Sequence, residues 1–208
     1  MAPDRWVVID DTDPGLDYSG NWFPDTTGSH DNVGILGPPY LQTLHWTRTD
    51  GSVSFQFNGI FDSSSESTAK DLNIYAGTAI EVWGTNDVVN HDTNTVPTLQ
   101  CFIDGASIDR EVPSQFAENN LKLCGKSGLP DGSHNLQIQV KVLSSSQPFW
   151  LDQIRYIPSP KMPLDNKIIY IRNNDPAIQF DAQWRSLGGN ASMTNTQGSV
   201  AQVTFVGK

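Results

Sequence analysis

The sequence has few basic residues and no long apolar run. Its 208 residues include 13 Lys and Arg against 23 Asp and Glu, so the formal net charge is -10 at pH 7. This balance argues against nonspecific DNA or RNA binding, which depends mainly on Lys and Arg neutralising phosphates. No segment approaches the roughly 18 apolar residues of a membrane-spanning helix. We therefore expect neither a nucleic-acid partner nor a membrane span in this chain.

Long helical periodicity is also missing. Short stretches instead alternate apolar and polar residues with the period of two that half-buried strands have, most clearly over 136–142, and again over 53–57 and 99–104. Turn-forming sequences rich in Pro, Gly and Asp separate these stretches. Many short strands punctuated in this way are typical of an antiparallel β-sandwich. The sequence therefore predicts an all-β fold.

The beginning of the sequence returns near its end. Residues 6–22 match 167–184, with the same spacing from an Asp-Pro pair to a Trp, and 52–59 match 200–207. Self-similarity of this kind is the signature of repeated structural modules. We therefore expect two copies of one module, of which the second is partial.

The repeat predicts the domain boundaries. A first module covers 1–158, a Pro-containing linker covers 159–166, and the N-terminal part of a second module covers 167–208. In the first module the polar segment 60–77 interrupts two strands that a short hairpin turn should join. We expect this segment to be a surface loop encoded by a short intron read in frame, and the natural protein to continue beyond Gly207.

Only two cysteines are present, Cys101 and Cys124. They are too few for a structural zinc site, which leaves a disulfide or two buried thiols. We expect the disulfide, because both lie beside alternating stretches, and it would place the protein in an oxidising compartment. Asn190 begins an Asn-Ala-Ser glycosylation sequon, which agrees with a glycoprotein. The sequence thus indicates an extracellular or cell-surface location, with leader and anchor absent from this chain.

An acidic cluster near the N-terminus could offer oxygen ligands to a hard cation. Asp10, Asp11 and Asp13 are the candidate metal ligands, and calcium suits such a set. The second copy keeps only the Asp of Asp-Pro, as Asp175. This favours a turn-forming role for Asp13 and Asp175 over a shared metal site. We expect no cofactor, with calcium as the alternative left open.

Enzyme motifs are weak throughout the sequence. No Gly-x-Ser-x-Gly nucleophile motif occurs, and Gly125-Lys126-Ser127 lacks the upstream glycine of a phosphate-binding loop. Asp104, Asp109 and Glu111 resemble a glycosidase carboxylate pair only loosely, because acidic residues at strand ends are ordinarily solvated. We expect a protein that is not an enzyme.

Six tryptophans are present, and most of them are expected to lie in the core. Trp22 and Trp184 recur in both copies and look structural. Trp46 and Trp83 lie near predicted loops and are the candidate ligand-binding residues, since an exposed indole stacks on the apolar face of a sugar. Core packing is the alternative for both.

Several motifs together carry a family resemblance. They are Asp-Asp-Thr-Asp-Pro at 10–14, Val-Trp-Gly-Thr at 82–85, Cys-Phe-Ile-Asp-Gly at 101–105, Asp-Gly-Ser-His-Asn-Leu at 131–136 and Phe-Trp-Leu-Asp-Gln-Ile-Arg-Tyr at 149–156. The chain resembles uncharacterised fungal, basidiomycete-type surface proteins, secreted or membrane-anchored, with tandem galactose-binding-like jelly-roll domains. The resemblance implies a galactose-binding-like jelly-roll β-sandwich followed by a partial second copy.

Function is less specific than fold at this level. The leading hypothesis is a noncatalytic extracellular carbohydrate-binding module with a glycan partner. The alternative is a structural or adhesive cell-surface domain without a small ligand, and a glycoside-acting enzyme ranks third. Fold analogy supports these hypotheses only by association, and the oligomeric state stays open.

Overall fold

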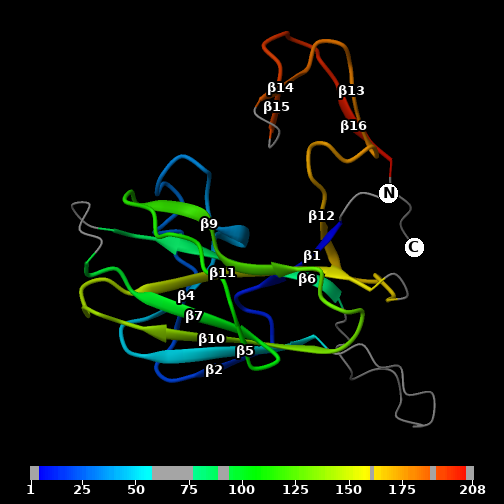
Figure 1. The fold of residues 1–208 in the computed structure, drawn as a ribbon. Helices are drawn as coiled ribbons and strands as arrows, with labels where there is room; N and C mark the ends of the chain where they lie inside the picture. Colours follow the sequence, from blue (N-terminus) through cyan, green and yellow to red (C-terminus); the bar gives the residue numbers. More distant parts are fainter. Residues whose placement is uncertain (1–4, 58–76, 89–93, 160–161, 188–190, 205–208) are drawn as a thin grey trace. The chain divides into compact units, whose positions relative to one another are not determined.

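The protein is described by a computed structural model that covers 5–57, 77–88, 94–159, 162–187 and 191–204 (Figure 1). Two compact units are present, one formed by Val7–Ile168 and the other by Met1–Trp6 with Ile169–Lys208. Strands dominate the described residues, in which the only helical element is the short 3₁₀ helix η1, Tyr40–Gln42. No helix in this part of the chain is long and apolar enough to cross a membrane.

The first sheet of the larger unit is built around the long strand β11. One side of β11 pairs with β1 and β4, the other side pairs with β6, and the sheet continues from β6 to β9 and from β4 to β3. All these pairings are antiparallel. The strands are β1 (Trp6–Asp10), β3 (Phe23–Asp25), β4 (Leu44–Thr47), β6 (Gly77–Asn86), β9 (Glu118–Ser127) and β11 (Phe149–Pro158).

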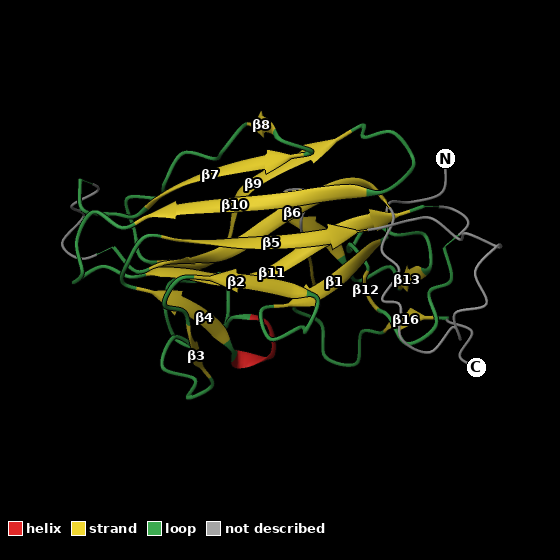
Figure 2. Cartoon of the chain, turned by 90° about the horizontal axis from the view of Figure 1, so that it is seen from below, coloured by secondary structure: helices red, strands yellow, loops and turns green. Residues whose placement is uncertain are grey.

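The second sheet has the order β2-β5-β10-β7-β8 and is also antiparallel. Figure 2 looks onto it, with β7, β10, β5 and β2 side by side in front of the first sheet. Its strands are β2 (Leu16–Ser19), β5 (Gly51–Phe57), β7 (Thr98–Ile103), β8 (Ala106–Ile108) and β10 (His134–Lys141). The all-β sandwich that the alternating pattern predicts is therefore confirmed.

The core lies between the two sheets and follows the alternation of the sequence. Along β10, Leu136, Ile138 and Val140 are buried while the residues between them face outward. From the first sheet, Tyr156 reaches across the core, and its ring centroid lies 6.3 Å from that of Phe55 on β5. Burying these apolar faces against each other supplies the main driving force for the fold.

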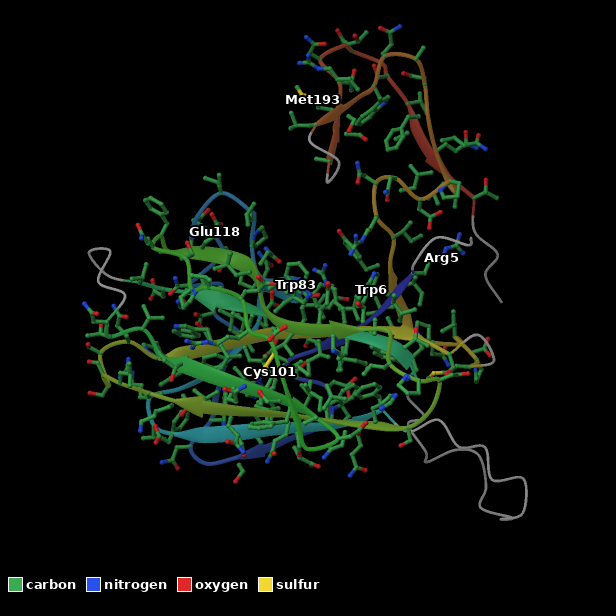
Figure 3. All side chains as sticks on the ribbon, in the orientation of Figure 1. Arg5, Trp6, Trp83, Cys101, Glu118 and Met193 are labelled. Atoms are coloured by element: carbon green, nitrogen blue, oxygen red, sulfur yellow. A yellow bond between two sulfur atoms is a disulfide. The ribbon has the colours of Figure 1, made fainter. Side chains whose placement is uncertain are left out.

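A disulfide joins the two sheets through the core. Cys101 on β7 is bonded to Cys124 on β9, and both residues are fully buried. Figure 3 shows the sulfur atoms between the sheets. The predicted disulfide is confirmed, and the alternative of two free thiols is wrong.

The smaller unit consists of short strands. β13 (Ile178–Phe180) pairs with β16 (Ala201–Val203), and β14 (Arg185–Leu187) pairs with β15 (Ala191–Met193). β12 (Ile168–Tyr170) precedes them in the chain. The bidentate approach of Arg5 to Asp175, with Nε 3.1 Å from Oδ2, ties the N-terminal residues into this unit.

The register of the smaller unit repeats that of the larger one. In the repeat, Ile178 corresponds to Leu16 and Val203 corresponds to Phe55. Leu16 pairs with Phe55 between β2 and β5, and Ile178 pairs with Val203 between β13 and β16. The two antiparallel pairs therefore meet at equivalent residues.

The Asp-Pro turn also has the same geometry in both places. Asp13 accepts a hydrogen bond from the Gly15 amide at 2.8 Å, and Asp175 accepts one from the Ala177 amide at 2.7 Å. This is the local side-chain capping expected of Asp at the start of a turn. Both residues therefore have the turn role that the repeat favours.

An aromatic pair follows each turn. The rings of Tyr18 and Trp22 lie 5.2 Å apart, and those of Phe180 and Trp184 lie 5.1 Å apart. The partial second module stays a prediction.

Three expectations fall outside the described residues. They concern the segment 60–77, of which only Gly77 is described as the first residue of β6, the sequon at Asn190 and the continuation past Gly207.

Candidate functional site

The outward face of the second sheet carries a group of uncharged polar side chains around one aromatic ring. Strand alternation places them there, because their neighbours in sequence point into the core. We call this surface the amide face. It consists of Ser52, Ser54, Gln56, Gln100, Phe102, Asn135, Gln137 and Gln139.

Strand register sets these side chains in rows across the sheet. Gln137 lies between Ser54 on β5 and Phe102 on β7, so an amide and a hydroxyl adjoin the ring. In the next row, Gln139 lies directly opposite Gln100. Phe102 and Gln137 are half-buried, which limits their motion. The centre of the face is therefore a fixed aromatic ring beside side chains that both donate and accept hydrogen bonds.

Among the residues that the structure describes, charged side chains stand only at the margins of the amide face. Asp17 lies on the edge strand β2, and Lys141 and Asp104 lie at strand ends. The Asp104 carboxylate already has protein partners, because it accepts a hydrogen bond from the backbone N–H of Asn135 at 2.8 Å and lies 2.7 Å from His134 Nδ1. The centre of this surface is thus suited to a neutral ligand rather than to an ion.

A wide hollow opens at one end of the amide face. It has a volume of about 540 Å³, within the size range of small-molecule sites. Gln100 and Gln139 of the amide face belong to its wall. Its complete lining is Asp50, Thr98, Leu99, Gln100, Arg110, Gln139, Val140 and Lys141.

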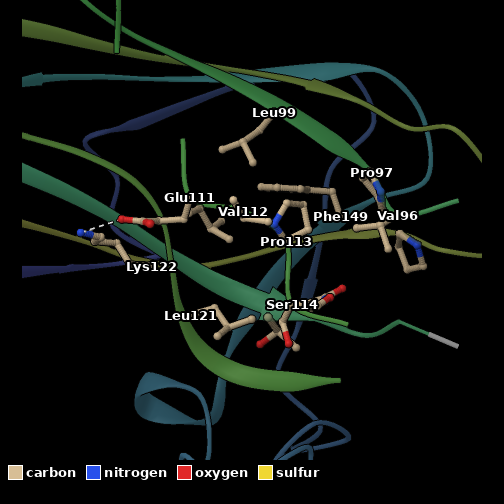
Figure 4. Close-up of a pocket in the computed structure, with 14 residues that line it drawn as sticks. Val96, Pro97, Leu99, Glu111, Val112, Pro113, Ser114, Leu121, Lys122 and Phe149 are labelled. Atoms are coloured by element: carbon tan, nitrogen blue, oxygen red, sulfur yellow. Dashed lines mark hydrogen bonds and ion pairs between the residues drawn. The ribbon is translucent and has the colours of Figure 1, made fainter. Parts of the chain in front are cut away.

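A second, smaller pocket opens near the starts of β7 and β11 (Figure 4). Its volume is about 90 Å³, well below the roughly 300 Å³ of the smallest ordinary ligand sites. Apolar side chains such as Leu99, Pro113 and Phe149 line it, and an ion pair of 2.8 Å between Lys122 and Glu111 lies at its side. It has room for one small apolar group and not for a sugar ring.

The two predicted ligand-binding tryptophans lie on the other side of the sandwich. Trp46 on β4 and Trp83 on β6 are half-buried on the outward face of the first sheet, and Figure 3 labels Trp83 there. Arg48 lies over the Trp46 ring at 5.0 Å, and Arg155 lies over the Trp83 ring at 4.3 Å. Each arginine covers a ring face in a cation–π contact. Their role as ligand platforms stays a prediction.

Sequence analysis did not identify the amide face. Its signal was present in the alternating segment 136–142, whose outward positions hold Gln137, Gln139 and Lys141 rather than the usual mixture of charges. The alternating stretches 53–57 and 99–104 were recognised as strands, but their pairing with 136–142 was not assigned from sequence. Only their pairing shows that Phe102 lies next to Gln137.

The predicted metal ligands are bonded to protein groups. Asp11 Oδ2 lies 2.7 Å from His45 Nδ1, Asp11 Oδ1 accepts the Thr43 hydroxyl at 2.8 Å, and Asp10 accepts the Thr12 amide at 3.2 Å. Within the described ranges, no group of three or more His, Cys, Asp or Glu residues could hold a metal ion. Calcium binding by Asp10, Asp11 and Asp13 stays an untested prediction.

Asp152 is a buried carboxyl in the same region. It accepts the Tyr40 amide at 3.0 Å, and its side chain is fully removed from solvent. Burial raises its pKa from an ordinary 3.8 to about 7, and the charges of Asp11 and Asp10 act in the same direction. In the folded protein the Asp152 carboxyl is therefore mostly protonated below a pH of about 7.

This raised pKa predicts a pH dependence of stability. The native state binds the Asp152 proton more tightly than the unfolded chain does, so the stabilisation is present at low pH and is lost as pH rises from about 4 to about 7. We expect Asp152→Asn, which keeps an acceptor for Tyr40, to lack this part of the slope. Urea unfolding of both proteins across this range measures it, and identical slopes would contradict the assignment.

Neither a protein-family description nor a curated protein sequence matches the chain. Solved structures that are similar include the catalytic domain of Agl-KA, 10% identical over 76% of this chain with a TM-score of 0.43. They also include the catalytic domain of a GH87 alpha-1,3-glucanase in complex with tetrasaccharides, 12% identical over 79% of this chain with a TM-score of 0.41. The chain spans only 28% and 30% of their lengths. Similarity at this level says nothing about activity or ligand.

Proposed function

We propose that the protein is a noncatalytic carbohydrate-binding module and that the amide face is its binding surface. The observation that carries the proposal is the uncharged surface of amides and hydroxyls around Phe102, with charges only at its margins. The disulfide between Cys101 and Cys124 supports an extracellular location, because such bonds persist in oxidising compartments.

The chemistry of this face matches that of a neutral sugar. A sugar ring offers hydroxyl groups that both donate and accept hydrogen bonds, and the amides of Gln137 and Gln139 do the same. Its apolar C–H surface stacks on an aromatic ring such as Phe102. Because neighbouring strands lie about 4.8 Å apart, a chain of sugar rings laid across them would follow one row and meet a side chain of each strand in turn.

The carboxyl groups support a noncatalytic role. Asp11 and Asp152 have 0% exposure, so neither can reach a scissile bond. Of the three carboxylates that sequence analysis considered for a glycosidase, Asp104 caps a strand end, Glu111 pairs with Lys122 and Asp109 is exposed to solvent. Glycoside hydrolysis requires two carboxyl groups that face each other across the substrate.

Binding to an oligosaccharide array, followed by titration of the best neutral ligand, tests the proposal. We expect Phe102→Ala to weaken binding about tenfold, which is about 1.4 kcal/mol, and Gln137→Ala to weaken it by less. Trp46→Ala and Trp83→Ala, on the opposite face, serve as controls and should leave the dissociation constant unchanged. Loss of binding in either tryptophan variant but not in Phe102→Ala would move the site to the first sheet. No binding to any glycan would overturn the proposal.

An adhesive role without a small ligand is the second candidate, and one observation favours it. The loop between β3 and β4 exposes apolar side chains, with Ile35 at 92% and Leu41 at 61% exposure. Glu118 holds this loop in place by accepting the amides of Ile35 and Leu36, each at 2.9 Å. Exposed apolar groups on a fixed loop are typical of contacts with another macromolecule.

A further inference from the structure

Two cationic side chains line the hollow at the end of the amide face. They belong to Arg110 and Lys141. Neither forms an ion pair with any residue that the structure describes. In a chain with only 13 basic residues and a net charge of -10, two such cations in one hollow make a local exception to the acidic surface.

Strand pairing holds both cations in position. Lys141 ends β10 directly opposite Thr98 on β7, and the next row holds Gln139 opposite Gln100. The backbone of Arg110 forms a bridge to Cys124, beyond the end of β8. The two charges therefore approach the hollow from different backbone segments, Lys141 from the second sheet and Arg110 from a residue that bridges to β9 of the first sheet.

One acidic residue shares the hollow and is partly occupied. Asp50 Oδ1 accepts the Val142 amide at 2.9 Å. The lining therefore has two positive charges against one negative charge, together with the amides of Gln100 and Gln139. Such a site favours an anion that also carries hydroxyl groups.

We propose that this hollow binds an anionic sugar residue, one that bears a carboxylate or a sulfate ester, at one end of a glycan whose neutral residues lie on the amide face. The inference rests on the proposed function. Arg110 supplies a planar pair of N–H donors that matches a carboxylate or sulfate, Lys141 supplies a compact charge, and Gln100 and Gln139 contact the ring hydroxyls.

Three oligosaccharide probes of matched length test the proposal on the full chain: a neutral one, one containing hexuronic acid and one carrying sulfate esters. We expect at least one acidic probe to bind about tenfold more tightly than the neutral probe at low salt, and this preference to fall as salt screens the charges. Comparing the hexuronic and sulfated probes identifies which anion is preferred.

The Arg110→Gln, Lys141→Gln double variant should lose the preference, so that it binds the acidic and neutral probes equally. Lys126→Gln, an exposed cation on β9, is the matched control and should change nothing. Equal affinity for neutral and acidic probes in the natural protein overturns the inference, and so does an equal loss in the Lys126→Gln control.

The outcomes separate this inference from the proposed function. Neutral binding that depends on Phe102, without any acidic preference, leaves the proposed function intact and refutes the anionic site. Binding of an acidic probe that depends on Arg110 and Lys141, together with an unchanged affinity in Phe102→Ala, supports the site in the hollow and refutes the amide face as a binding surface. Binding of none of the three probes refutes both.

Discussion

A protein in which Cys101 and Cys124 are both replaced by alanine is expected to lose about 3 kcal/mol of unfolding free energy. The bond closes a loop with a sequence separation of 23 residues and joins β7 of one sheet to β9 of the other. Without it the unfolded chain gains conformational freedom, and the covalent link between the two sheets is lost. Urea unfolding of both proteins measures the difference in unfolding free energy, with one common slope for its dependence on urea concentration.

A reducing agent provides the internal control for this experiment. It should lower the unfolding midpoint of the natural protein once the buried bond is reduced, and it should leave the double alanine variant unchanged. Equal midpoints for the natural and variant proteins under nonreducing conditions would show that sheet packing alone sets the stability.

The second large effect is expected at Asn119, a fully buried polar residue on β9. Its Nδ2 donates to the carbonyl oxygens of His30 at 2.7 Å and of Val33 and Gly37 at 3.1 Å, while its Oδ1 accepts the Thr85 hydroxyl at 2.7 Å. Replacement by alanine removes the partner of the buried Thr85 hydroxyl and three hydrogen bonds to part-buried carbonyl groups of the loop, and each lost hydrogen bond costs about 1 kcal/mol. We expect Asn119→Ala to lower the unfolding free energy by about 3 kcal/mol.

The same substitution should release the loop between β3 and β4. This loop packs against the first sheet, where the His30 ring lies 4.0 Å from that of Trp150. Amide hydrogen exchange in Asn119→Ala should therefore be accelerated more strongly in the loop than in β10. Asn135→Ala, an exposed asparagine on β10, is the control and should cost less than about 0.5 kcal/mol. A loss of unfolding free energy at Asn119 no larger than this would show that its hydrogen bonds do not hold the loop.

The fold was largely readable because its signals are local. Alternation over 136–142 predicts which side chains of β10 face the core, and Leu136, Ile138 and Val140 are buried there. The Asp-Pro turn was readable for the same reason, since Asp13 caps an amide only two residues away. A period of two and a two-residue hydrogen bond need no knowledge of the rest of the chain.

The candidate site was not readable, because it depends on which strands become neighbours. Phe102 and Gln137 are far apart in sequence and adjoin only because β7 pairs with β10. The tryptophans gave a stronger local signal, yet the first sheet places Trp46 beneath Arg48 and Trp83 beneath Arg155. A sequence shows that a ring exists, whereas packing decides what covers it.

The sequence by itself thus determined the class of the fold, the face that each alternating strand turns inward and the Asp-Pro turns, and it narrowed the roles of its two cysteines to a disulfide or two buried thiols. Tertiary structure alone decided that amides from β5, β7 and β10 form one surface, that Arg110 and Lys141 share a hollow, and that Asn119 and Asp152 lie buried beside a loop. The physical reason is that periodicity and capping act within a few residues, while strand order, burial and the local dielectric are properties of the assembled sheets.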